Sequence, residues 1–248
     1  MHRLLSSVFA LAFAAFCLVA APAVAAGKTG YKNPPSTNVR QVFLQRNART
    51  MEILESDFPY DYEDVMRSIE TLRASKTDID SKLLALFSQL TQIRKKYAER
   101  LRFAPVAQHR LMIAALGRFM AEVQLKAGPA ICGHFAQDGS GALFAEGVAA
   151  RFASLIDIQS AAYFAAVVGA IESPEPRDAV DDEDWRAVFS RMVADGHPPA
   201  FVGTIARSDA ADPTLCPALA AMLSSAARMD GAAAERFRAD FAGNVTGY

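Results

Sequence analysis

The chain has 248 residues, of which 52% are hydrophobic and 21% are charged, and its formal net charge is −1. An apolar content this high excludes an intrinsically disordered polymer. The balance of 26 Lys and Arg against 27 Asp and Glu excludes a uniformly basic nucleic-acid binder, and 14 Gly with 3 Cys exclude a collagen-like or disulfide-dense chain. We therefore expect a globular protein of one or two domains.

The first 26 residues have the three-part layout of a secretory signal peptide. Arg3 supplies a positive start, and an uncharged apolar run follows from Val8 to Ala21 before a group of small residues. This run of about 14 residues is shorter than the roughly 20 that span a bilayer, which favours cleavage over a retained membrane anchor. We expect cleavage near Ala25 or Ala26 and a periplasmic or extracellular protein.

Signal cleavage removes Cys17 and leaves Cys132 and Cys216. An even, minimal number of cysteines in an exported chain predicts one structural disulfide between them. A redox pair or a thiolate metal site is the alternative, but the chain has no Cys-x-x-Cys, and the two cysteines lie 84 positions apart. Closing a loop of that length would contribute roughly 4–5 kcal/mol of stability in the loop-entropy model.

Helical spacing of apolar residues begins after residues 27–37, whose Gly, Lys, Pro and Asn content predicts an extended linker. One helix is expected from Asn38 to Glu55, because apolar residues recur there at helical spacing and Pro59 follows. A shorter helix is expected between Tyr62 and Leu72.

The clearest predicted helix spans residues 79–101, where apolar residues recur at steps of three and four in a heptad-like seam. Thr77 and Asp80 are expected to cap its start. A basic group from Arg94 to Arg102 occupies its last turns, where cations offset the helix dipole, with contact to an anionic membrane surface as the alternative interpretation. The seam consists of Ile79, Leu83, Leu86, Leu90, Ile93, Tyr97 and Leu101.

A fourth helix is expected from Pro105 to residue 127, where Gly128-Pro129 stops it. Only a few residues join it to the helix at 79–101, so we expect the two to pack antiparallel. Residues 38–127 are thus predicted to be a helical hairpin region with shorter helices laid on it. The apolar stripe of the fourth helix consists of Val106, Ile113, Leu116, Met120 and Val123.

The charge balance changes at the end of this region. Residues 27–126 carry 17 Lys and Arg against 11 Asp and Glu, a balance of +6, whereas residues 127–248 carry 8 Arg against 16 acidic residues, a balance of −8. Residues 128–248 are Ala-rich, which favours helix and close packing, and they show no strand pattern. The predicted fold is all-α, a long antiparallel hairpin followed by an Ala-rich helical bundle. Helices are expected there at 141–156, 158–171, 181–194, 201–207, 213–229 and 232–241.

Cys132-Gly133-His134 combines a thiolate and an imidazole, which are both ligands for zinc or copper. His109 and His197 are the other histidines that remain after signal removal, and neither forms a helical pair with another ligand. We therefore assign Cys132 to the disulfide and interpret His134 as a polar surface residue beside it.

Two further site hypotheses have weaker patterns. Haem held by His109 and a methionine such as Met112 or Met120 is conceivable, but these residues fit a core stripe or a helix face equally well. Residues 137–141 resemble an anion-binding loop at a helix start but lack the strand and the Lys-Ser/Thr of a phosphate loop. We interpret them as a loop that joins two helices.

Two groups of acidic residues are candidates for acid-base chemistry, which requires burial that separates their pKa values. Both groups lie at expected helix starts, where carboxylates stabilise the dipole, and neither has the spacing of a calcium loop. We therefore favour the structural interpretation. The groups are Asp57, Asp61, Glu63 and Asp64, and Asp181, Asp182, Glu183 and Asp184.

The sequence predicts an exported, non-enzymatic helical interaction or scaffold protein of the cell envelope. We assign no catalytic, cofactor or metal residue, and expect the partner to be another envelope protein or a second copy bound through helix faces, with no nucleic acid. The alternatives are a periplasmic carrier of an apolar small molecule or lipid, and an enzyme with an unrecognised site. An enclosed apolar pocket would favour the carrier, and an exposed apolar stripe would favour the interaction protein.

Overall fold

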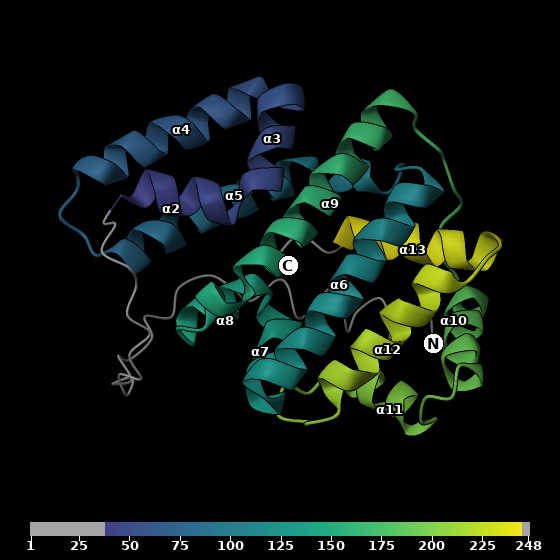
Figure 1. Cartoon of the computed structure of the whole chain (residues 1–248). Helices are drawn as coiled ribbons and strands as arrows, with labels where there is room; N and C mark the ends of the chain where they lie inside the picture. The colour runs from purple at the N-terminus through teal and green to yellow at the C-terminus, as the bar shows by residue number, and fades with distance from the viewer. Residues whose placement is uncertain (1–37, 245–248) are drawn as a thin grey trace.

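The structure, a computed structural model, describes residues 38–244, so the predicted signal peptide (1–26) and linker (27–37) lie outside the described residues. Within these bounds the chain is all-α, as predicted, with twelve α-helices, one 3₁₀ turn and no strand (Figure 1). The elements are α2 (Val39–Arg46), α3 (Ala48–Asp57), α4 (Pro59–Ala74), α5 (Ile79–Leu101), α6 (Val106–Ala127), α7 (Pro129–Asp138), α8 (Ser140–Ala145), η1 (Ala149–Phe152), α9 (Ala153–Glu172), α10 (Asp182–Ala194), α11 (Ala200–Arg207), α12 (Leu215–Arg228) and α13 (Ala232–Asn244).

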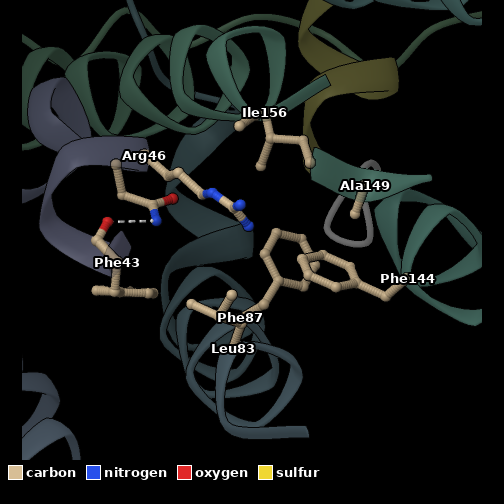
Figure 2. A pocket seen from close by; sticks show the side chains of 9 residues that line it. Phe43, Arg46, Leu83, Phe87, Phe144, Ala149 and Ile156 are labelled. Carbon is tan, nitrogen blue, oxygen red and sulfur yellow. Dashed lines mark hydrogen bonds between the residues drawn. The ribbon is translucent and has the colours of Figure 1, made fainter. Parts of the chain in front are cut away.

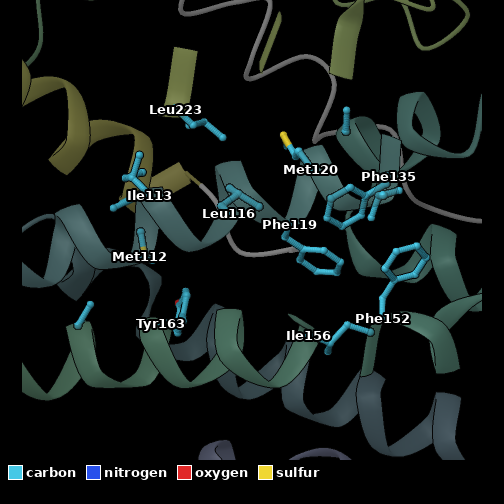
Figure 3. Close-up of a cluster of buried hydrophobic side chains, with 14 of the residues drawn as sticks. Met112, Ile113, Leu116, Phe119, Met120, Phe135, Phe152, Ile156, Tyr163 and Leu223 are labelled. Atoms are coloured by element: carbon cyan, nitrogen blue, oxygen red, sulfur yellow. The ribbon is translucent and has the colours of Figure 1, made fainter. Parts of the chain in front are cut away.

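The helix α6 lies at the centre of the molecule, between α9 on one side and α12 on the other (Figure 1). The predicted stripe is its buried face, except that Val106 is only partly buried. Figure 3 shows this face meeting side chains from α7, η1, α9 and α12. Phe119, for example, packs against Phe135 and Phe152, with ring centroids 4.6 and 6.2 Å away.

A long antiparallel hairpin is present, but it consists of α4 and α5, which residues 75–78 join (Figure 1). Asp61 near the start of α4 binds Lys96 near the end of α5, with 2.9 Å between Oδ1 and Nζ, which fixes the antiparallel direction. The expected pairing of α5 with α6 is wrong. Both helices bury their apolar faces, but α5 packs on α9, α13 and α4, while α6 packs on α12 and α9.

The expected helix over 38–55 is two helices, because the chain breaks at Asn47 between α2 and α3. The break is stabilised from a distance by Asp157 of α9, whose carboxylate accepts hydrogen bonds from the backbone N–H groups of Arg49 and Thr50 at 3.2 and 3.0 Å. Asp157 thereby caps the start of α3, a role that local sequence does not reveal.

The N-cap of α5 is Asp78, and the predicted pairing of Thr77 with Asp80 is wrong. The Asp78 carboxylate accepts a hydrogen bond from the backbone N–H of Ser81 at 2.9 Å. The basic residues at the end of α5 do not all face solvent. Arg94 is buried and lies over the Phe87 ring, 5.5 Å from its centroid.

The Ala-rich region divides differently from the prediction. Residues 129–138 form α7, which was not expected, and the predicted helix over 141–156 is replaced by α8, η1 and the first turn of α9. Gly147 explains the end of α8: at φ +69° it allows its own N–H and that of Val148 to bond back to the carbonyls of Phe144 and Leu143, in a Schellman motif. The other five predicted helices are present as α9 to α13.

The two sulfurs of Cys132 in α7 and Cys216 in α12 lie at disulfide distance, 1.90 Å apart, with both residues buried. The pair joins the turn that follows Gly128 to the start of α12, as the sequence predicts. It therefore links α7, the helix that follows the predicted hairpin region, to α12.

Among the described residues, the segment 149–172 is long and apolar enough to cross a membrane by length and composition. Most of it is buried between α3, α5 and α6, as the core helix of a folded domain would be.

Candidate functional site

The residues weighed as metal or haem ligands do not come together in the described part of the chain. His134 is exposed beside the paired Cys132, and within residues 38–244 no three His, Cys, Asp or Glu side chains converge. His109 is fully buried, with Nε2 donating a hydrogen bond to the Leu101 carbonyl at 2.6 Å. Met112 is likewise a core residue.

The acidic groups are engaged with cations or helix starts. Asp61 is buried beneath Lys96 and also accepts a hydrogen bond from the Tyr97 hydroxyl at 2.5 Å. Asp184 forms a capping box with Asp181, as expected for a helix start. Its carboxylate also accepts two hydrogen bonds from the Arg236 guanidinium, from Nη2 at 2.7 Å and from Nε at 2.8 Å.

A small apolar cavity of about 30 Å³ lies between α2, α5, α8 and α9. Figure 2 shows the Arg46 side chain reaching toward Phe87, whose ring packs on Phe144 with centroids 4.6 Å apart. A volume of this size holds about one water molecule, not an apolar ligand. This cavity therefore gives no support to the carrier hypothesis.

A larger, open groove of about 790 Å³ runs between α6 and α12 and is bordered by the residues that lead into α11. We call it the α6–α12 groove. Its lining is mostly small or apolar and consists of Ala114, Gly117, Arg118, Ala121, Gln124, Leu125, His197, Pro198, Phe201, Pro217, Ala220, Ala221, Ser224, Ala227 and Arg228.

One wall of the groove is the exposed face of α6. The side chains of Leu111 and Leu125 are 67% and 79% exposed, although both are large and apolar. They end a row at helical spacing that is exposed throughout and that we call the α6 row: Leu111, Ala114, Arg118, Ala121 and Leu125. Such an uncovered apolar stripe on a folded protein is typical of an interaction surface.

At Gly117, which lines the groove, α12 approaches α6 closely. A Cβ at this position would lie 3.2 Å from the Leu223 Cβ and 3.4 Å from the Ala220 carbonyl oxygen.

The charged side chains that line the groove are Arg118 and Arg228, and no carboxylate lines it among the described residues. Arg228 is held by Asp195 at 2.9 Å. Arg118 forms no close ion pair with any residue of the described range; Glu122, one turn away, pairs with Lys126 at 2.7 Å and also feels the charge of Arg118.

The apolar spacing of the sequence predicts the buried stripe of α6 but not the opposite, exposed row. The available signal was the recurrence of Leu111 and Leu125 along a row in which Arg118 is the one polar member, with Glu122 beside the row. That face stays exposed only because α12 and α9 cover the other sides of α6, which is a property of the tertiary fold.

No protein-family model, no curated protein and no solved structure matches this chain.

Proposed function

We propose that this chain is a non-enzymatic interaction or scaffold protein of the cell envelope, and that it binds another protein through the α6–α12 groove. The observation that carries the proposal is the α6 row, in which Leu111 and Leu125 are more than half exposed beside an open groove. Exposed leucines contribute nothing to this fold, so a partner that covers them would gain hydrophobic stabilisation.

Two further features support the proposal. The groove is open along its length, which suits a protein segment better than a small molecule that must be enclosed. The placement in the envelope rests on the secretory signal pattern of the first 26 residues.

Site-specific photo-crosslinking tests the proposal. A photoreactive phenylalanine derivative replaces Leu111, Leu125 or, as a control, Tyr60, which is 83% exposed on α4. We expect a discrete protein adduct from both positions of the α6 row in the organism that encodes the chain, and none from Tyr60. Adding Leu111→Asp to the Leu125 variant should remove the adduct.

Several results would contradict the proposal: no adduct heavier than the chain itself, an adduct with only the mass of a lipid, or the same adduct at Tyr60. Far-UV circular dichroism of each variant checks that it folds. Because all three positions are exposed, replacement should leave the core intact.

A further inference from the structure

We infer that the α6–α12 groove receives an acidic amphipathic helix of the partner protein. This inference rests on the proposed function and specifies the chemistry of the partner segment that fits the groove.

The shape of the groove suits a helix. The α6 row runs from Leu111 to Leu125, which at 1.5 Å per residue is about 21 Å, or roughly four helical turns. Its two leucines stand at the ends, and Ala114 and Ala121 lie between them. A helix laid along α6 and α12 would set its own apolar residues between these leucines and approach the alanines closely.

The charge of the groove specifies an acidic partner. Arg118 lies midway along the α6 row, so any segment that covers both leucines also covers its guanidinium. Burying a guanidinium without a counter-charge is strongly unfavourable. No carboxylate lines the groove in the described part of the chain, and Glu122, which acts on Arg118 from beside the α6 row, is shared with Lys126, so a carboxylate of the partner would complete the pairing of Arg118.

Other occupants fit less well. A second copy related by a twofold axis through the α6 row would bring its own Arg118 face to face with this one, which is repulsive. A fatty carboxylate would satisfy Arg118, but the open groove would leave much of its chain in water, whereas small-molecule sites bury most of the ligand.

The test is a pair of synthetic helical peptides of about 18 residues, long enough to span the row. Both carry leucine at helical spacing on one face; one has glutamate and the other lysine at the flanking positions. Fluorescence anisotropy at low salt measures their binding to the folded chain. We expect the glutamate peptide to bind at least about tenfold more tightly.

Two substitutions test whether peptide binding depends on Arg118 and Leu111. Arg118→Glu should reverse the preference between the peptides, and Leu111→Asp should weaken both. The matched controls lie on α4: Arg73→Glu, whose side chain is 60% exposed, and Tyr60→Asp should leave both affinities unchanged.

The inference is overturned if neither peptide binds, if both bind equally, or if Arg118→Glu does not change the preference. It is also overturned if dodecanoate binds stoichiometrically and displaces the peptide, or if Leu111→Asp converts a dimer to a monomer in sedimentation. A protein adduct from Leu111 together with no preference for the glutamate peptide would leave the proposed function standing and remove only this inference.

Discussion

His109 places a titratable side chain inside the corner between α5 and α6. It is fully buried, and its Nδ1 has no hydrogen-bond partner among residues 38–244. Burial lowers its pKa from 6.5 to about 4, and the cations Arg177 and Arg238 act in the same direction, opposed by Glu175 and by the hydrogen bond to the Leu101 carbonyl.

This pKa predicts an acid-dependent loss of stability. The unfolded chain accepts a proton on His109 near pH 6.5, whereas the folded chain does so only near pH 4. The stabilisation of the folded state by the neutral imidazole is therefore present above pH 6.5 and lost as the pH falls toward 4. At about 1.4 kcal/mol per pKa unit, the loss amounts to about 3 kcal/mol.

Urea unfolding between pH 7 and pH 4 measures this effect. In His109→Gln, which keeps an N–H donor for the Leu101 carbonyl, we expect the unfolding free energy to fall less with pH than in the unaltered chain. His134→Gln, at an exposed position, is the matched control and should behave like the unaltered chain. Equal pH dependence in all three proteins would contradict the assignment.

At the scale of elements, Asp157 connects α9 to the start of α3. Its buried carboxylate accepts hydrogen bonds from two backbone N–H groups and from the Thr50 hydroxyl at 2.9 Å, and Arg49 pairs with it at 3.4 Å. Asn47, the residue that precedes α3, makes no side-chain cap. The α3 start therefore depends on a residue from a distant helix.

Asp157→Ala should destabilise the fold by about 2–3 kcal/mol, because it leaves buried backbone donors without an acceptor. Thermal and urea unfolding give the value. Asp64→Ala removes a carboxylate whose pair with Arg67 is exposed, and should cost about 0.5 kcal/mol or less. Similar losses from the two substitutions would show that Asp157 does not cap α3.

This cap illustrates which elements are predictable from sequence. The helices α5, α6 and α10 were predicted to within one or two residues, because each has a clear apolar period and a stop signal such as Gly128 or Gly196. The break at Asn47 was missed because the group that stabilises it lies 110 positions away. The α6 row was missed because exposure depends on how the helices pack.

At the scale of the whole molecule, the two regions of opposite charge share one apolar core. Among the ion pairs described in residues 38–244, Arg49 with Asp157 and Arg110 with Asp230 join residues 38–127 to the rest. Each of the other ion pairs joins two residues of the same region. Ion pairs between the regions therefore neutralise little of their opposite charges. Apolar packing of α6 on α9 and α12 is what holds the regions together.

The Cys132 and Cys216 sulfurs lie at disulfide distance, and a bond between them would add a covalent link across this core and close a loop of 84 positions. In the chain that begins at residue 27, reduction or the double substitution Cys132→Ser and Cys216→Ser should lower the unfolding free energy by up to about 4–5 kcal/mol, since it releases the unfolded chain from the loop. Urea unfolding with and without reductant measures the change.

The double variant is also the control for the reductant, which should not affect its stability. Thiol titration of the denatured, unreduced chain from residue 27 should find no free thiol, and two free thiols would contradict the link.

Because Cys216 lies at the start of α12, a chain without the link should first lose the packing of α12 on α7. The helices α4 and α5, which form a separate hairpin, should keep their hydrogen-exchange protection longer. Simultaneous loss of protection in both regions would instead show that the shared core unfolds as one unit.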